Sequence, residues 1–385
     1  MTADADSKNA RPPHKEDVMQ IRAAVTAGAG ERFDIRRLYL EPPGTGEVLV
    51  RMSGVGICHS DLIVRDAWYP VPLPVVLGHE GAGVVEKVGA GVTEVSAGDH
   101  VVLSFSSCGG CTQCRGGSPA YCVEFVSRNF GCRRPDGTTS LRCGADPVHG
   151  FFFGQSSFAT HAVVPVQSVV KVAADLPLPL LGPLGCGVQT GAGAVLKALR
   201  CEAGSRIVVF GAGTVGCSAV MAAALAGCSA IVVVGRNPAR LRLAEEFGAT
   251  HVISASATGV ATAVRAVSAG PGFDYSIEAT GVPELLRTAV DVLHTRGVCG
   301  VIGAAPPGTE VALEISGLMF GRSVRGIVEG DMVPQIDIPL LAALHANGRL
   351  PFDRMVSTYP FEAINEAAED MTSGKCTKPV LVFEE

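Results

Sequence analysis

The sequence predicts an α/β protein with a strand-rich domain and a second domain built on a doubly wound parallel sheet. Short alternating runs broken by glycine and proline fill residues 21 to 187, which is typical of strands joined by loops. Strand-like and helix-like segments alternate from 188 to 328, as they do in a parallel sheet covered by helices. The strand-and-turn texture returns from 329 to 385.

Length and composition exclude several classes of protein. The chain has 385 residues, enough for two domains with their own cores, and 47% of them are hydrophobic. A net charge of −6 argues against nucleic acid or an anionic membrane as a partner. No run of about eighteen apolar residues predicts a membrane span. Residues 1–20 are polar and lack the apolar core of a signal peptide, so we expect a disordered head.

The strand-rich domain is predicted from three runs. Residues 47–52 and 81–88 alternate as strands do, and residues 96–102 supply a turn followed by a strand. A short helix is expected to begin near Cys58 and Asp61. The candidate metal ligands therefore lie on the loops between these strands.

The first candidate metal site combines Cys58, His79 and Cys186. Two thiolates and an imidazole form a three-ligand zinc set that leaves the fourth position open for a substrate oxygen. Asp61 is placed to accept a hydrogen bond from His79 and so fix its tautomer, although it could simply cap the helix. Glu80, beside His79, is a candidate alternate ligand.

The second candidate metal site is a four-cysteine lobe, residues 108–122. Its four thiolates would fill a closed tetrahedral zinc site, and they are Cys108, Cys111, Cys114 and Cys122. The alternative, a zinc ribbon that binds nucleic acid, fits poorly with an acidic chain. Of thirteen cysteines, six fit the two sites, and disulfide frameworks belong to short secreted chains. We therefore expect a reducing cytoplasm.

Three aromatic residues are assigned to the substrate cleft. Trp68, Tyr69 and Phe105 are close in sequence to the metal ligands or to the four-cysteine lobe. The run 151–153 and Phe158 are assigned to the core instead, since aromatic runs are more often core than pocket.

The second domain contains a dinucleotide motif. A helix is expected over 188–199, and the strand 206–210 leads into Gly211-x-Gly213-x-x-Gly216 and then a helix. Glycines in this position make the turn, admit the pyrophosphate and allow close helix packing. The remaining predicted elements are a strand at 230–234, a helix at 238–247, and strands at 275–278 and 297–303.

The end of the second strand predicts the cofactor. An acidic residue there, about twenty residues after the glycine motif, holds the ribose 2′-hydroxyl of NAD. This chain has Gly235 instead, followed by Arg236, whose guanidinium can bind a 2′-phosphate in a bidentate manner. Asn237 can add a donor, and Arg240 can reach the same phosphate. The sequence therefore predicts NADP, with NAD as the alternative if the arginines lie in a solvated loop.

These motifs together resemble the zinc-dependent medium-chain alcohol dehydrogenase family, most closely its aryl (benzyl) alcohol branch. The resemblance rests on 56–61, 78–80, Cys186, the four-cysteine lobe and 211–216, and it extends from about residue 21 to the C-terminus. It implies a GroES-like catalytic domain over 21–187 and 329–385, a Rossmann domain over 188–328, and a cleft between them for cofactor and substrate. It also implies two zinc ions per chain and a homodimer or homotetramer.

The resemblance implies hydride transfer between nicotinamide and an aromatic, allylic or terpenoid primary alcohol or its aldehyde. Ser60 resembles the hydroxyl that takes the alcohol proton. Ile63 replaces the histidine that ends this relay in many relatives, so the route stays open, and His59 could complete it or bind the pyrophosphate. The further residues assigned to the cofactor are Thr190, Thr214, Val215, Thr280, Gly303 and Lys378.

Two rival functions are weighed against this one. A zinc-free quinone or enoyl reductase on the same fold would not need the three metal ligands together. A nucleotide sensor without catalysis would bind the cofactor but not turn it over. An assay with a panel of primary alcohols and aldehydes separates these possibilities.

Overall fold

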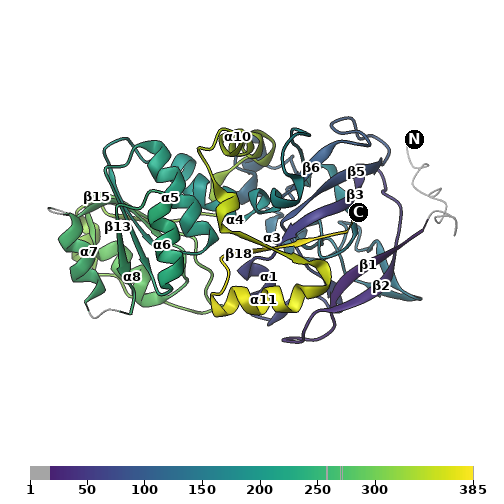
Figure 1. Cartoon of the computed structure of the whole chain (residues 1–385), viewed down its shortest axis with the longest axis horizontal. Helices are drawn as coiled ribbons and strands as arrows, with labels where there is room; N and C mark the ends of the chain where they lie inside the picture. Colours follow the sequence, from purple (N-terminus) through teal and green to yellow (C-terminus); the bar gives the residue numbers. More distant parts are fainter. Residues whose placement is uncertain (1–17, 257–258, 269, 271, 385) are drawn as a thin grey trace, which may run out of the picture.

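The computed structural model describes residues 18–256, 259–268, 270 and 272–384. The molecule is elongated, and two halves of different architecture lie at the ends of its long axis (Figure 1). We call them the β-rich half, made of two sheets and their loops, and the parallel-sheet half, made of one sheet and its helices. The predicted α/β fold class is confirmed.

The β-rich half holds a five-stranded and a seven-stranded sheet. The first has the order β4 (Val75–Val76), β1 (Met19–Thr26), β2 (Asp34–Leu40), β7 (Leu141–Cys143), β8 (Asp146–Val148). The second has the order β10 (Val169–Lys171), β6 (His100–Leu103), β5 (Gly81–Val88), β3 (Glu47–Gly56), β18 (Lys378–Val382), β17 (Val356–Pro360), with β9 (His161–Pro165) paired to β3. The strands predicted around 47–52, 81–88 and 96–102 are confirmed by β3, β5 and β6.

The expected disordered head, residues 1–20, is too long at its C-terminal end. Strand β1 begins at Met19, and Met19 and Gln20 pair with Leu40 and Tyr39 of β2, so residues 19 and 20 belong to the fold. Residues 1–17 lie outside the described part of the chain.

The parallel-sheet half has the strand order β13 (His251–Ser254), β12 (Ala230–Gly235), β11 (Arg206–Phe210), β14 (Phe273–Glu278), β15 (Leu293–Val301), β16 (Ser323–Gly326). Its strands β11 and β12 are almost continuously apolar and buried, as parallel strands covered on both faces must be. The helices are α5 (Thr214–Ala226), α6 (Pro238–Glu246), α7 (Val260–Ser268), α8 (Pro283–Asp291) and α9 (Ile315–Met319). The predicted alternation of strand and helix is confirmed.

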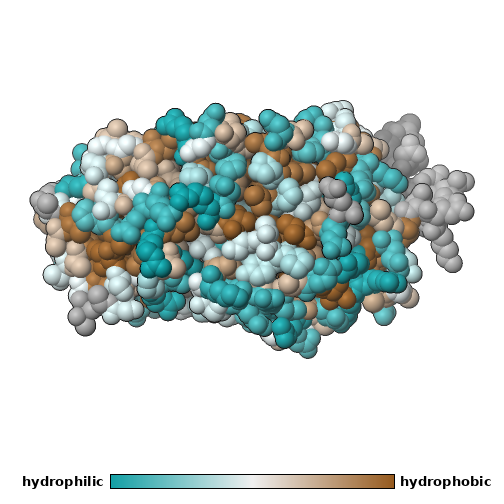
Figure 2. All heavy atoms as spheres, viewed as in Figure 1, coloured by the Kyte–Doolittle hydropathy of each residue, from teal (hydrophilic) through white to brown (hydrophobic). Residues whose placement is uncertain are grey.

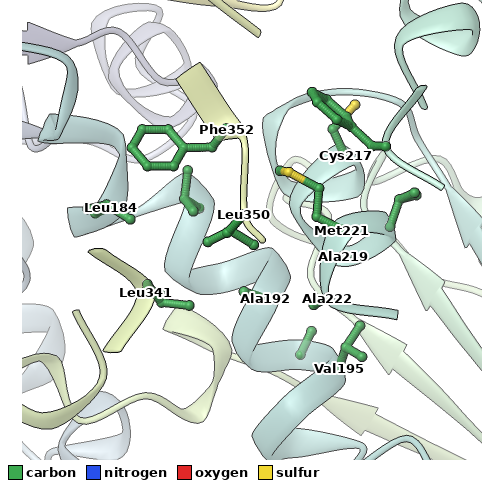
Figure 3. Close-up of a cluster of buried hydrophobic side chains, with 14 of the residues drawn as sticks. Leu184, Ala192, Val195, Cys217, Ala219, Met221, Ala222, Leu341, Leu350 and Phe352 are labelled. Atoms are coloured by element: carbon green, nitrogen blue, oxygen red, sulfur yellow. The ribbon is translucent and has the colours of Figure 1, made fainter. Parts of the chain in front are cut away.

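Helix α4 (Gly187–Gly193) joins the two halves. It is buried along its whole length and continues through a π turn to Ala198, which confirms the helix predicted over 188–199. Small residues let it approach α5 closely, because a Cβ added to Gly191 would lie 2.1 Å from the carbonyl oxygen of Val215. Figure 3 shows side chains of both helices meeting in one buried cluster with Leu350 and Phe352 of the tail.

The tail differs from the expected strand-and-turn texture. Strands β17 and β18 are present, but two helices, α10 (Pro334–Ala346) and α11 (Ile364–Ser373), were not predicted. Prolines 334 and 339 look like helix breakers in the sequence. Pro334 occupies the first turn, where the missing N–H would have no partner anyway, and Ile338 and Leu341 are buried in the core.

The surface is mixed in character. Figure 2 shows polar side chains over most of one face, with apolar side chains gathered near the end of the parallel-sheet half and around the middle. Within the described residues, no helix combines the length and the apolar character that a membrane crossing would need.

Candidate metal and cofactor site

The structure brings together four side chains of the first predicted metal site. Cys58 precedes helix α1 (His59–Arg65), His79 and Glu80 lie before β5, and Cys186 precedes α4. One potential ligand atom from each of the four lies within 4.8 Å of the others, although the residues come from three separate segments. A sulfur, nitrogen and sulfur set at this spacing matches the donors that zinc prefers.

The imidazole of His79 is held in one orientation. Its Nδ1 lies 2.8 Å from Oδ1 of Asp61, and both side chains are buried. Its Nε2 is also buried and has no hydrogen-bond partner among the described residues. An unpartnered nitrogen beside two cysteines is what a metal ion would satisfy, so the residues fit zinc.

Asp61 performs both of the functions that the sequence left open. Its Oδ2 accepts a hydrogen bond from the backbone N–H of Cys58 at 2.9 Å and so caps α1, while Oδ1 faces His79. Burial opposes the charged imidazole, yet the Asp61 carboxylate and the Cys58 sulfur together outweigh it and raise the pKa of His79. Because a ligating histidine must be neutral, metal binding would displace that proton.

Glu80 and Lys378 form a buried ion pair beneath the metal ligands. Nζ of Lys378 donates to the two carboxylate oxygens of Glu80 at 2.9 and 2.8 Å and to the carbonyl of Ile57 at 2.9 Å. These contacts occupy all three donors of the ammonium group. The expectation that Lys378 binds the cofactor is therefore not met in this structure. The same bonds hold the carboxylate of Glu80, the candidate alternate ligand.

A buried carboxyl group, Glu329, was not predicted. Its Oε2 accepts from Nε2 of Gln189 at 2.9 Å and from the hydroxyl of Thr190 at 3.4 Å, and Oε1 lies 3.9 Å from Sγ of Cys186. Burial raises its pKa to about 7. Its partners are some 140 residues away in the sequence, so no local spacing could have indicated this site.

The predicted proton-relay residues lie at the edge of the metal site. The hydroxyl of Ser60 is 3.7 Å from Sγ of Cys58. His59 is exposed, and its ring lies edge-on to Trp68 with centroids 6.4 Å apart. Ile63 is buried in α1. The hydroxyl of Ser60 thus lies against a metal ligand, and His59 faces solvent.

The four-cysteine lobe is assembled as predicted. Its four sulfurs lie within 4.8 Å of one another around helix α2 (Thr112–Arg115). Backbone N–H groups point at the sulfurs: Cys111 N lies 3.3 Å from Cys108 Sγ, and Cys108 N lies 3.3 Å from Cys122 Sγ. Backbone N–H groups of Cys114 and Val123 lower the pKa of Cys111 to about 6. Donors of this kind favour thiolates, which is the form that binds zinc.

An aromatic cluster covers one side of His79. Phe153 stacks on the imidazole with centroids 4.6 Å apart, and Phe152 meets it edge-on at 5.5 Å. Phe130, at the end of helix α3 (Phe125–Phe130), lies 5.2 Å from Phe153, and Tyr69 lies 6.2 Å from Phe130. The assignment of residues 152 and 153 to the core alone was therefore incomplete. Phe151 and Phe153 both have positive φ, 63° and 51°, a strained value for a bulky residue that is visible only in the structure.

The three residues assigned to the substrate cleft separate in the structure. Tyr69 belongs to the aromatic cluster and donates its hydroxyl to the carbonyl of Ala305 at 2.9 Å. Phe105 is buried and reaches the cluster through Phe125, at 5.8 Å. Trp68 is 39% exposed and packs on His59 instead. Its assignment to the cleft is therefore the weakest of the three.

The glycine motif adopts the geometry of a dinucleotide-binding turn. Gly211 has φ of +113°, and a Cβ on Gly216 would lie 1.8 Å from the carbonyl oxygen of Gly211. A Cβ on Gly213, by contrast, would meet nothing within 4 Å, so there is open space beside this residue. Helix α5 begins directly after it, with Thr214 and Val215 as its first two residues. An open helix N-terminus of this kind fits a pyrophosphate.

The other predicted cofactor residues converge on the same edge of the sheet. A Cβ on Gly211 would lie 3.1 Å from Cγ2 of Thr280, and one on Gly303 would lie 2.7 Å from the N of Thr280. The three residues follow β11, β14 and β15, so the ends of these strands meet as the doubly wound fold requires. Thr190 lies apart from them, on α4 beside Cys186.

The end of β12 leaves one arginine free. Gly235 is the last residue of the strand, and Arg236 follows on the surface. No carboxylate lies within ion-pair distance of Arg236 in the described part of the chain. Its guanidinium is thus available to a phosphate.

Asn237 and Arg240 have other partners than expected. Asn237 caps α6 through Oδ1 and donates Nδ2 to the carbonyl of Gly374 at 2.8 Å. One terminal nitrogen of the Arg240 guanidinium donates hydrogen bonds to the carbonyls of Met371 and Cys376 at 2.9 and 2.6 Å. Both side chains therefore tie α6 to the tail, and their contact with a 2′-phosphate stays a prediction.

Each half of the chain matches the model of a known protein family. Residues 44–174 match a family model described as "Alcohol dehydrogenase GroES-like domain", and residues 214–345 match one described as "Zinc-binding dehydrogenase". The chain is 43% identical over 370 residues to a geraniol dehydrogenase of Castellaniella defragrans, an alignment that covers 96% of this chain and 99% of that protein.

Two crystal structures have the same fold along nearly the whole chain. An alcohol dehydrogenase zinc-binding domain protein from Burkholderia ambifaria is 50% identical, with a TM-score of 0.94, covering 96% of this chain and 100% of that one. A benzyl alcohol dehydrogenase from Acinetobacter calcoaceticus is 45% identical, with a TM-score of 0.92, covering 95% and 100%.

Proposed function

The chain belongs to the zinc-dependent medium-chain alcohol dehydrogenase family, and from this premise we propose that it transfers hydride between NADP(H) and a primary alcohol or aldehyde with an aromatic, allylic or terpenoid substituent. The observation that carries the proposal is the unpartnered Nε2 of His79, which lies between two cysteines and beneath the ring of Phe153. It supports a buried metal site next to an aromatic surface.

The proposed roles of the metal-site residues follow from their positions. Zinc bound by Cys58, His79 and Cys186 would polarise the substrate oxygen as a Lewis acid, and the nicotinamide would exchange hydride with the substrate carbon. Asp61 keeps the proton of His79 on Nδ1 and its Nε2 free for the metal. Ser60 takes the hydroxyl proton of the alcohol at the edge of the site.

We assign a second zinc to the four-cysteine lobe, so that each chain holds two ions. The lobe has four sulfur donors and leaves no ligand position for a substrate. Its ion would stabilise the fold, since structural zinc binding is coupled to folding.

The aromatic cluster supports the substrate class. The names of two relatives, a geraniol dehydrogenase and a benzyl alcohol dehydrogenase, denote an allylic terpenoid alcohol and an aromatic alcohol. Apolar surface buried against Phe153 and Tyr69 would favour such substrates by roughly 25 cal/mol per Å².

Turnover of a panel of alcohols tests the proposed function. We expect kcat/KM for benzyl alcohol and geraniol to exceed that for ethanol, and Phe153→Ala to lower the first two much more than the third. Phe361→Ala, which removes a buried ring of the tail away from the metal site, is the matched control for lost stability. Equal constants for ethanol and benzyl alcohol would refute the substrate class, and cofactor binding without turnover would favour a sensor.

We propose further that residues 21–187 and 329–385 form the catalytic domain and 188–328 the nucleotide-binding domain. We place the protein in the cytoplasm, where the six metal-site thiols would stay reduced.

We also propose a homodimer or homotetramer formed through the parallel-sheet half. Strand β16 lies at the end of that sheet, and Ile315, Met319 and Phe320 are exposed nearby.

A further inference from the structure

The segment that leads back from the parallel sheet to the β-rich half is strained. Glu329, Gly330 and Asp331 follow β16 and have φ values of 49°, 67° and 57°. Positive φ is unfavourable for residues with a Cβ, and two of these three have one. Such a run persists only where its surroundings hold it, and held strain is typical of functional sites.

One side of the segment is fastened to the four-cysteine lobe. The hydroxyl of Tyr121 donates to Oδ1 of Asp331 at 2.6 Å, and Tyr121 immediately precedes the lobe residue Cys122. The backbone N–H of Val328 donates to the same hydroxyl at 3.4 Å. Arg325, at the end of β16, forms an ion pair with the other oxygen of Asp331.

The other side is fastened to α4, close to the metal ligands. Glu329 accepts hydrogen bonds from Gln189 and Thr190, as described above. The backbones also touch: a Cβ on Gly330 would lie 2.5 Å from the carbonyl oxygen of Gln189, and one on Gly193 would lie 2.3 Å from that of Gly330. The segment therefore cannot shift without moving α4, which begins directly after Cys186.

We propose that Tyr121 and Asp331 are positioning residues for hydride transfer. They anchor the strained segment to the rigid metal-bound lobe, and the segment in turn places Thr190 and the start of α4 where the nicotinamide end of the cofactor binds. The four-cysteine lobe thus stabilises more than itself, because it sets the geometry between the two halves. The inference rests on the proposed function, in which Thr190 contacts the cofactor.

The test compares three conservative variants of the full-length, zinc-loaded enzyme. Tyr121→Phe removes one hydroxyl, and Asp331→Asn removes the charge while keeping a residue that tolerates positive φ. Tyr359→Phe is the matched control for loss of a tyrosine hydroxyl, since its hydroxyl donates to Asp370 at 2.8 Å within the tail. The measurements are the dissociation constant of NADPH from its fluorescence, kcat, KM for the alcohol, zinc content and Tm.

We expect Tyr121→Phe and Asp331→Asn each to weaken NADPH binding or to lower kcat by roughly tenfold, the effect of one hydrogen bond to a charged group. KM for the alcohol and the zinc content should stay at the wild-type values. The double variant should be no worse than either single one, because the two residues act through one contact. Tyr359→Phe should keep the wild-type constants.

Four results would overturn the inference. A lower Tm with unchanged binding and kcat would leave Tyr121 only a structural role. Equal losses in Tyr359→Phe would show that any lost tyrosine hydroxyl has this effect. Wild-type constants in both test variants, together with a wild type that binds NADPH and oxidises alcohols, would remove the positioning role but leave the proposed function intact. A wild type that binds no dinucleotide would overturn both.

Discussion

We predict that single residues at the end of β12 determine the choice between NADP and NAD. Gly235 leaves the end of the strand without a carboxylate, and Arg236 beside it is exposed at the surface. Loss of that guanidinium should affect only the cofactor that carries a 2′-phosphate. This separates a cofactor contact from a general effect on stability.

We expect the wild type to prefer NADP, and Arg236→Gln to lower kcat/KM for NADP by about 10–100-fold with little change for NAD. Arg242→Gln, which changes an exposed arginine further along α6, should leave the ratio unchanged. Measured specificity constants for both cofactors decide the matter. A wild type that prefers NAD would contradict the assignment.

Gly235→Asp should reverse the preference toward NAD. A carboxylate there repels the 2′-phosphate and can accept a hydrogen bond from the 2′-hydroxyl. The new Cβ would lie 3.0 Å from Cδ2 of Leu241 and 3.2 Å from Cβ of Ala212, so these side chains must give way slightly and some loss of Tm is expected. The ratio of the two specificity constants is the readout, and an unchanged ratio would count against the role of Gly235.

Asp61 controls the metal site through a single oxygen. Asp61→Asn should preserve the cap on α1 but weaken zinc binding at the first site by about 10–100-fold, because an amide no longer enforces the tautomer of His79. Competition with a chelator measures this affinity directly. Asp66→Asn, at the exposed C-terminal end of the same helix, is the control. Unaltered affinity in Asp61→Asn would show that the hydrogen bond to His79 is dispensable.

Among the structural elements, the two sets of ligands should respond differently to mutation. Cys111→Ser should lower Tm and release one zinc, since the lobe has little apolar core and is organised around its sulfurs. Cys186→Ser should leave a folded protein with almost no activity. Cys143→Ser, in β7 outside both sites, should change neither property. Metal analysis that finds fewer than two zinc ions in native wild type would contradict the scheme.

The tail shows how elements from distant parts of the sequence support the site. Helix α11 receives the side chains of Asn237 and Arg240, and β18 carries Lys378 to the ion pair with Glu80. A buried pair of this kind holds the elements together, because removal of one partner leaves an uncompensated charge. The tail therefore links helix α6 of the parallel-sheet half to Glu80 beside the candidate metal ligands.

In the whole molecule, the open edge of the parallel sheet is the proposed contact between chains. All four residues of β16 are exposed, and an edge strand offers unpaired backbone groups to a second copy. Symmetric pairing of this edge would also cover Met319 and Phe320. A homodimer is the smallest assembly that does so.

We expect light scattering of the wild type to give the mass of a dimer or tetramer, and Phe320→Glu to shift it toward the monomer. Val88→Glu places the same charge on an exposed apolar position of β5 and should leave the mass unchanged. A monomeric wild type would contradict the proposed assembly.

The sequence alone determined the elements whose partners are close along the chain. The four cysteines of the lobe fall within fifteen positions, and the glycine motif lies between a strand and a helix that are themselves readable from their periodicity. Residues that are close in the sequence can adopt few relative positions, so the residue types alone nearly suffice to predict the site. The first metal site could also be predicted from the sequence, because its two cysteines and its histidine occur together with the four-cysteine lobe and the glycine motif.

Only the tertiary structure decided which polar groups were already in use. The sequence predicts Asn237 and Arg240 as phosphate donors, and the structure shows that one nitrogen of each also donates to carbonyl groups 131 to 137 residues away. Phe153 read as core, and Glu329 was not noticed, yet folding places both against metal ligands. Helix α10 was not predicted, and it contains two prolines, which disfavour a helix in the local sequence. Burial of Ile338 and Leu341 against the rest of the core stabilises the helix in the folded protein. The contacts of a hydrogen-bond donor, an aromatic ring or a helix face depend on residues that are distant in the sequence. A local sequence pattern therefore does not predict them.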